Sequence, residues 1–172
     1  MKNIHIILLG ILFLGICLIN TGCGSSNSNS YNGVTPEEQE VIDIATGYFG
    51  KFCNSKEDVL SQTSESFTYI YGSVYPEHGN YSNYSTRLGE FFNSYIMTEC
   101  VLEDAAAISC DSESARVGGR LIYKYHQAGS EEIIANSEEI EAGLVKESSA
   151  WVVNYISGRN NRGIDFPFNG SL

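Results

Sequence analysis

Few residues in this chain combine a reactive side chain with an informative spacing, and the cysteines come first among them. Beyond the first 23 residues the chain carries Cys53, Cys100 and Cys110. Their spacing contains no pair of the kind that binds zinc or forms a thioredoxin-type redox centre. The two histidines of the same region, His78 and His126, lie far apart, and no nucleotide-binding or serine-hydrolase motif is present. We therefore expect no metal ion and no cofactor.

The N-terminal residues have the pattern of an export signal. Lys2 precedes an apolar run of 16 residues (4–19), and the small residues Thr21 and Gly22 stand directly before Cys23. This pattern resembles the signal of bacterial lipoproteins. The resemblance implies that Cys23 receives a palmitate-containing lipid and becomes the N-terminus of the mature protein.

One departure and two alternatives accompany this interpretation. Asn20 stands where such signals usually carry an aliphatic residue. The chain could instead be secreted without a lipid, or the apolar run could remain as a membrane anchor. The run is shorter than the roughly 20 residues of a spanning helix, and no basic stop-transfer cluster follows it. We predict that residues 1–22 are a lipoprotein signal peptide, that 23–34 form a flexible Gly/Ser/Asn tether, and that the protein is extracytoplasmic and lipid-anchored to a bacterial membrane.

The charge balance excludes some partners. Lys2 is the one Lys, Arg, Asp or Glu in the first 22 residues, so the remaining 150 carry 9 basic and 21 acidic residues, a net charge of −12. Such a surface repels nucleic-acid phosphates and anionic lipid headgroups. We expect no binding of nucleic acid, and membrane association through the lipid in place of a basic patch.

Helical signals dominate the segment after the tether. Thr35, Pro36 and Glu38 form a capping-box start. Apolar residues then recur at helical spacing in one stripe: Val41, Ile44, Ala45, Tyr48 and Phe52. We expect this helix to end near Cys53 and a second, short helix to begin at Ser55. A strand is predicted over 66–72, a loop over 73–85 and a third helix over 86–96.

From residue 97 the pattern changes to strands. Four runs, 97–108, 115–126, 132–146 and 150–157, are separated by short polar turns, which indicates antiparallel hairpins in a meander. Gly118 predicts, together with the glycine that follows it, a bulge or bend in the second run. The layout is α+β, with three N-terminal helices packed on a curved antiparallel sheet of four to five strands.

The order of these elements resembles the NTF2-like (nuclear transport factor 2-like) superfamily, whose fold is also called the cystatin-like cone. The resemblance covers residues 35–157 and is carried by the closing strands, where Gly-Leu-Val-Lys-Glu (143–147) leads into Ala-Trp-Val-Val-Asn-Tyr (150–155). It implies an NTF2-like domain at 35–157 and a C-terminal extension at 158–172. It says little about function, because one fold hosts many activities.

Enzymes of that superfamily build a pocket between the sheet and the helices, so polar residues that face inward are candidates for chemistry. Parity places Asp104 on one strand face with Cys100, and Tyr155 on one strand face with Trp151. An Asp104 that faces Tyr123 or Tyr155 could act as a base beside a phenol that stabilises an oxyanion, as in ketosteroid isomerase.

A structural role is the simpler interpretation of the same residues. Asp104 precedes three alanines (105–107), and a bulge there could turn its side chain toward water. Buried tyrosines and Trp151 are usually packing groups. A charge run in the third strand is expected on a solvated face: Glu138, Glu139 and Glu141. We therefore assign no catalytic residue.

The three remaining thiols constrain any disulfide of an exported chain. An unbroken strand through Cys100 and Cys110 separates them by about 33 Å at roughly 3.3 Å per residue. The Cα atoms of a disulfide lie within about 7 Å of each other. An intramolecular disulfide is therefore expected to use Cys53, with either Cys100 or Cys110.

Three classes of function stay open. The first is a non-enzymatic binding or assembly module for a protein partner in the cell envelope. The second is a small-molecule binder that uses the cone, and the third is an isomerase-, dehydratase- or cyclase-like enzyme. The absence of a histidine from the predicted pocket and of any catalytic motif favours the first. The resemblance adds the expectation of a homodimer through the sheet.

Overall fold

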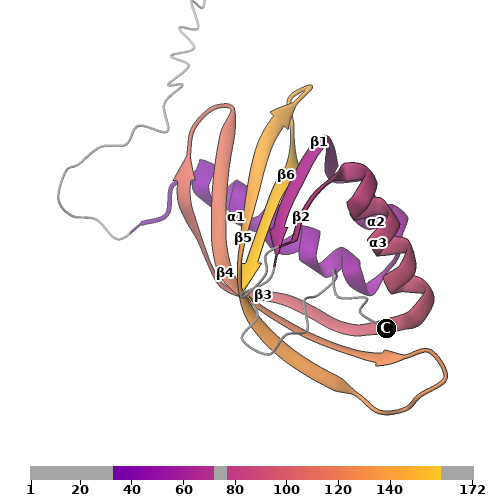
Figure 1. The fold of residues 1–172 in the computed structure, drawn as a ribbon. Helices are drawn as coiled ribbons and strands as arrows, with labels where there is room; N and C mark the ends of the chain where they lie inside the picture. The colour runs from indigo at the N-terminus through magenta and orange to yellow at the C-terminus, as the bar shows by residue number, and fades with distance from the viewer. Residues whose placement is uncertain (1–32, 72–76, 160–172) are drawn as a thin grey trace, which may run out of the picture.

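The computed structural model describes residues 33–71 and 77–159, which form helices on one side of a curved sheet (Figure 1). In chain order the elements are α1 (Pro36–Gly50), the 3-10 helix η1 (Lys51–Cys53), α2 (Lys56–Leu60), β1 (Thr63–Tyr71), β2 (Glu77–Asn80), α3 (Tyr81–Ser94), β3 (Tyr95–Cys110), β4 (Ser114–Gln127), β5 (Ile134–Glu147) and β6 (Ala150–Arg159). The predicted signal peptide, Cys23 and nearly all of the tether and C-terminal extension lie outside the described residues.

The α+β class is confirmed, but the sheet has six strands, in the order β2-β1-β6-β5-β4-β3, where four or five were expected. The four long strands pair antiparallel as the meander predicts. β1 adds to β6 in parallel, with Thr68 opposite Tyr155, and β2 pairs antiparallel with β1. β6 is therefore an interior strand, and β3 and β2 are the two edges.

The first helix starts where its capping residues predict. The Glu38 backbone N–H donates to Thr35 Oγ1 over 3.2 Å, and the Thr35 N–H donates to Glu38 Oε2 over 2.8 Å. Pro36 occupies the first turn, where its missing N–H costs nothing. α1 gives way at Gly50 to η1, which keeps Phe52 buried and ends at Cys53, as expected.

The segment between β1 and α3 differs from its prediction. Residues 77–80 form β2, and α3 begins at Tyr81, five residues before the expected start. The cause is a second capping box, in which Asn80 and Asn83 each accept from the other's backbone N–H, over 3.1 and 3.3 Å. Because the capping residues are asparagines in a polar stretch, the sequence favoured a loop there.

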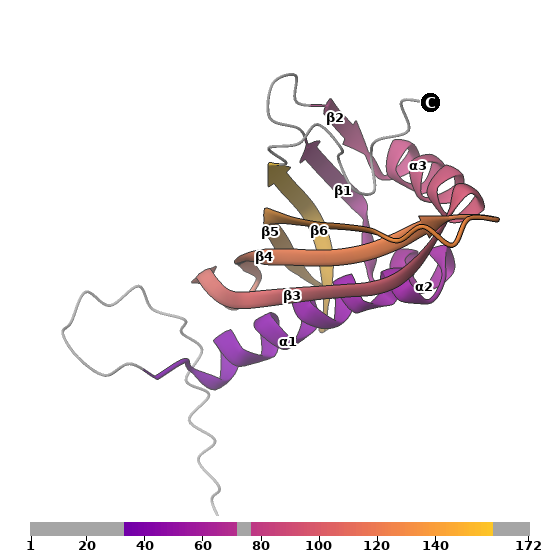
Figure 2. The same cartoon turned by 90° about the horizontal axis from the view of Figure 1, so that it is seen from below.

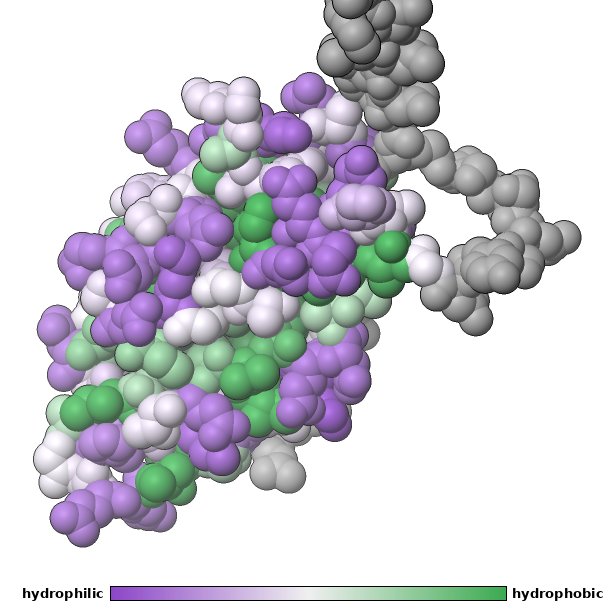
Figure 3. All heavy atoms as spheres, turned by 180° about the vertical axis from the view of Figure 1, so that it is seen from behind, coloured by the Kyte–Doolittle hydropathy of each residue, from purple (hydrophilic) through white to green (hydrophobic). Residues whose placement is uncertain are grey.

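The helices cover one face of the sheet. α1 lies mainly along β3, and α2 and α3 lie near one end of the molecule (Figure 2). In Figure 1, α1 passes behind the strands. The buried side chains between the layers form one cluster that includes Val41, Ala45, Tyr48 and Phe52 of the predicted stripe, with Ile44 partly buried against them. Leu121, Tyr123, Trp151 and Val153 of the sheet belong to the same cluster. Seen from behind, apolar surface forms a band between hydrophilic regions (Figure 3).

The predicted bulge is present, but on β3 and not on β4. From Glu103 to Ala106 β3 takes three steps where its partner takes two, from Arg120 to Gly118. β4 pairs with β5 without interruption through the same region. The glycines still matter, since a Cβ on Gly119 would lie 2.9 Å from the Glu103 carbonyl oxygen. Gly118 and Gly119 therefore allow the bulged strand β3 to approach β4 closely.

Candidate functional site

Asp104 sits in the bulge and does not face the interior. Its backbone φ of 52° is in the left-handed region, and its side chain is 81% exposed. One carboxylate oxygen lies 3.5 Å from Arg120 Nη2. The expectation that Asp104 shares a face with Cys100 is wrong, because the extra residue of the bulge reverses the alternation of side chains beyond Glu103.

The two candidate tyrosines lie on opposite faces of the sheet. Tyr123 is fully buried beneath the helices, where its ring stacks on Tyr125 at a centroid distance of 6.1 Å. Tyr155 is half-buried on the other face, opposite Gly143. A register shift in β6 after Val153 reverses its alternation, so Tyr155 does not share the face of Trp151. The structure therefore does not bring Asp104, Tyr123 and Tyr155 together.

The interior holds one carboxylate that sequence reasoning missed. Glu138 was expected on a solvated face, yet it is only 4% exposed, opposite Leu121 on the helix-covered side of the sheet. Its neighbour Glu139 is exposed as expected. The signal was available, because Glu138 has the parity of Ile140, which is buried on the same strand.

Hydrogen-bonded hydroxyls occupy the interior near α1 and α3. The hydroxyl oxygens of Tyr48 and Tyr84 lie 2.6 Å apart, and Tyr48 Oη is also 3.3 Å from Thr63 Oγ1. Thr63 in turn donates to the Val59 carbonyl over 2.9 Å. Burial is the main cause that raises the pKa of both phenols, so both stay neutral at physiological pH.

Aromatic rings fill the space around these hydroxyls. Phe67 stacks on Tyr84 at 4.4 Å between ring centroids, and Tyr48 packs edge-on against Phe49 and Phe52. All five side chains are at most 1% exposed. These rings form a packed core in which the Tyr48 hydroxyl bonds to those of Tyr84 and Thr63.

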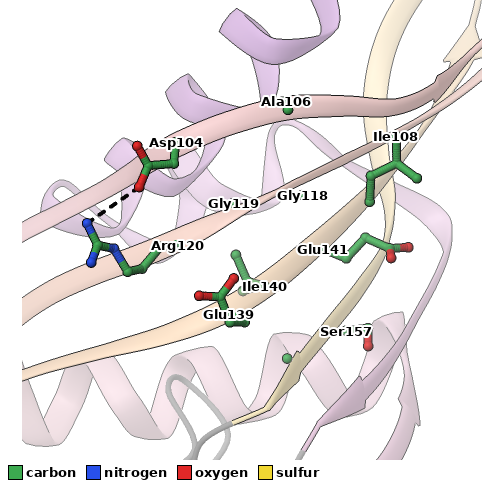
Figure 4. Close-up of a pocket in the computed structure, with 11 residues that line it drawn as sticks. Asp104, Ala106, Ile108, Gly118, Gly119, Arg120, Glu139, Ile140, Glu141 and Ser157 are labelled. Carbon is green, nitrogen blue, oxygen red and sulfur yellow. Dashed lines mark hydrogen bonds and ion pairs between the residues drawn. The ribbon is translucent and has the colours of Figure 1, made fainter.

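A hollow of about 700 Å³ lies on the face of the sheet away from α1. Gly118 of β4 lies in this hollow and contributes no side chain to it. Ile108 lies beside Gly118. Figure 4 shows Asp104 and Arg120 facing each other at one end, with Glu139 and Glu141 projecting from β5. We call this hollow the outer groove.

The charges of the outer groove are partly paired. Arg120 donates to Glu103 over 2.8 Å as well as lying near Asp104. Arg116, on the same strand as Arg120, pairs with Glu141. Such exposed ion pairs contribute little to stability. They leave the groove with more carboxylates than guanidinium groups.

Cys53, Cys100 and Cys110 are all free thiols. Burial, followed by the nearby Cys53 thiol and the Glu138 carboxylate, raises the pKa of Cys100 well above its usual range. Within the described ranges, no group of three or more His, Cys, Asp or Glu side chains could hold a metal ion.

Solved structures similar to this one show the fold. An NTF2-like protein from Cytophaga hutchinsonii aligns with a TM-score of 0.58 at 11% identity, over 70% of this chain and 95% of that one. A ketosteroid isomerase-like protein from Erwinia carotovora atroseptica gives a TM-score of 0.58 at 11% identity, over 75% and 97% of the two chains. The association domain of CaMKII from C. elegans gives 0.54 at 10% identity, over 71% and 94%.

The domain therefore has an NTF2-like fold. No protein-family model matches the sequence, and no curated protein matches it. At identities this low the likeness carries the fold and no activity.

Proposed function

We propose that this NTF2-like domain is a non-enzymatic binding module, tethered by a lipid on Cys23 outside a bacterial cytoplasm, which docks a protein partner of the cell envelope in its outer groove. One observation carries the proposal. The described interior contains a packed aromatic core, whereas the outer groove lies on the opposite face and is lined by charged side chains from several strands.

The anchoring half of the proposal rests on the sequence. The small residues before Cys23, the short apolar run and the uncharged tether are its support. Among the helices of residues 33–71 and 77–159, none has both the length and the apolar character that crossing a membrane requires.

The chemistry of the groove favours a basic partner. Asp104, Glu139 and Glu141 line it, against Arg120 in the groove and Arg116, which pairs with Glu141. Net charge beyond the signal is −12, which attracts a positively charged surface at long range. The occupant we propose is a lysine- or arginine-rich segment of another envelope protein. One structural neighbour is named as an association domain, which agrees with a use of this fold in assembly.

A zero-length cross-linker that joins carboxylates to amines tests the partner directly. In membranes of the source bacterium, we expect cross-links from Glu139 or Glu141 to a lysine of one partner protein. Glu139→Lys reverses an exposed charge in the groove and should abolish them. Glu132→Lys makes the same change at an exposed position outside the groove and should leave them intact.

Two outcomes would overturn the proposed docking site. One is an unchanged cross-linking pattern in Glu139→Lys. The other is cross-links that join two copies of this chain, which would make the groove part of a homodimer.

A second candidate is a small-molecule site, or an isomerase- or dehydratase-like activity, inside the cone. The sequence suggested Asp104 as its acidic group, but the side chain of Asp104 points to water. Glu138 gives this candidate a better basis, because it lies on the same inner face as Tyr123. Native mass spectrometry after exposure to a metabolite mixture separates the candidates. A bound molecule that Glu138→Gln removes and Asp104→Asn retains would favour the cone.

A further inference from the structure

Cys53 and Cys100 meet where η1 lies against β3. Cys53 is the last residue of η1, and the Cys100 backbone N–H is near enough to its thiol to lower the pKa of that thiol. η1 packs on β3 along this contact. Cys53 is exposed, and the Cys100 side chain is buried on the inner face of its strand. An accessible thiol thus stands beside a buried one.

We propose that Cys53 and Cys100 form an intramolecular disulfide in the exported protein, and that Cys110 stays reduced. The proposal rests on the export half of the proposed function, since disulfides persist in oxidising compartments. It narrows the sequence-based expectation, which left Cys100 and Cys110 as alternatives.

The position of Cys110 excludes it as the partner. Cys110 is the last residue of β3, ten residues beyond Cys100 along the same strand. Two register irregularities lie between the two residues, and β4 advances from Tyr123 to Ala115 over the same span, so Cys110 lies roughly 26 Å from Cys100. No disulfide spans that separation, because its two Cα atoms lie within about 7 Å.

The reaction is two thiol–disulfide exchanges with an oxidised extracytoplasmic oxidoreductase or a small disulfide such as oxidised glutathione. The Cys53 thiolate attacks one sulfur of the oxidant, forms a mixed disulfide and releases the oxidant's other sulfur as a thiol. The Cys100 thiolate then attacks the Cys53 sulfur and releases the second thiol. Two protein thiols are oxidised, and one external disulfide is reduced.

The surroundings of the pair slow its spontaneous oxidation. Burial and the carboxylate of Glu99 raise the pKa of Cys53, against the lowering effect of the Cys100 N–H. Burial, Cys53 and Glu138 raise the pKa of Cys100. Tyr84 also lies near Cys100, and it is neutral. Little thiolate is present at neutral pH, so an exchange catalyst or mild alkali speeds the first step.

The disulfide would enclose residues 53–100, with α2, β1, β2 and α3 inside the loop. It would tie the end of the α1–η1 segment to the edge strand β3. A cross-link over a loop of this length restricts the unfolded chain strongly, so the oxidised form should be clearly more stable than the reduced one.

The test uses the full-length chain, purified in detergent and equilibrated in oxidised and reduced glutathione at pH 8.5. We expect peptide mapping to find Cys53 joined to Cys100 and Cys110 alkylatable. Reduction should lower the Tm by about 5 °C or more. The Cys110→Ser control should keep this shift, whereas Cys53→Ser, at an exposed position, should lose it without misfolding.

Cys53 joined to Cys110, or both Cys53 and Cys100 left reduced in oxidised glutathione, would overturn the pairing. The compartment is tested separately by trapping thiols with an alkylating agent in intact cells. A pair that forms in vitro but is reduced in cells would contradict export and leave the geometry standing, which distinguishes the two failures.

Discussion

At the residue scale, the backbone of Asp104 is strained by its place in the bulge of β3. Its φ of 52° is a region where the Cβ of an L-residue is crowded. We predict that Asp104→Gly raises the free energy of unfolding by up to about 1 kcal/mol, or leaves it unchanged, because the crowding is relieved. Asp104→Val should lower it by about 1–2 kcal/mol, since a β-branched residue tolerates this backbone poorly. Urea denaturation measures both.

Loss of the ion pair between Asp104 and Arg120 does not affect the comparison between the two variants. Both variants lose it equally, and an exposed pair is worth little. Equal stability of Asp104→Gly and Asp104→Val would show that the residue is not held in the left-handed conformation.

The hydroxyl pair of Tyr48 and Tyr84 gives a second prediction at this scale. Tyr84→Phe removes one partner of a buried bond of 2.6 Å. We expect the free energy of unfolding to fall by about 1–2 kcal/mol, because Tyr48 keeps only its longer contact with Thr63. Tyr81→Phe, on a half-buried ring of the same helix, is the matched control and should change it by less than about 0.5 kcal/mol. Indistinguishable melting of the two variants would contradict the buried bond.

Sequence reasoning about single residues succeeded where the alternation of a strand was unbroken. It made Trp151 a packing group, and Trp151 is buried in the core. For Asp104 the parity argument failed, whereas the alternative of a bulge beside the three alanines that turns its side chain toward water agrees with the structure. For Tyr155 it failed because the bulge in β6 depends on strand pairing. Glu138 was missed for another reason, since its charge outweighed its position in the alternation.

At the scale of elements, substitutions at two glycines distinguish the effect of helix propensity from the effect of close packing between strands. A methyl group on Gly47, within α1, would meet nothing within 4 Å, so Gly47→Ala should raise the free energy of unfolding by about 0.5–1 kcal/mol. On Gly119, a Cβ would lie 2.9 Å from both the Glu103 carbonyl oxygen and Leu102 Cδ1. Gly119→Ala should therefore lower it by about 1–3 kcal/mol.

Thermal melts of both alanine variants check this contrast. Stabilisation by Gly119→Ala would mean that β3 does not approach β4 as closely as the bulge requires.

The boundaries of the helices and strands were predicted accurately where the local sequence signal was strong. The Thr35 capping box and the serine at Ser55 predicted the starts of α1 and α2. The four long strands were recognisable from alternation and short turns. β2 has only four residues and forms because it pairs with β1. Its own composition therefore did not predict a strand. The parallel pairing of β1 with β6 likewise joins segments too far apart for any local pattern.

At the scale of the whole molecule, the lipid anchor gives a direct prediction. Replacing Cys23 with Ala removes the thiol that the lipid would modify, so we expect the variant to leave the membrane fraction. Cell fractionation with immunoblotting measures this. Cys53→Ser serves as the control, because it removes a thiol without touching the signal, and it should stay with the membranes. Equal membrane retention of Cys23→Ala and the wild type would refute the lipoprotein assignment.

The position of β6 affects the order in which this protein can be completed. β6 runs between β1 and β5, yet it is the last of the strands within residues 33–71 and 77–159. During synthesis or vectorial transport, the paired strands β1 and β2 emerge before the meander and have no further strand to join until residues 150–159 arrive. A chain that ends before Ala150 loses the interior strand and not an edge, which separates β1 and β2 from the meander. Premature termination or proteolytic trimming that removes β6 should therefore abolish folding. Loss of β2, an edge strand, should only make the sheet one strand narrower.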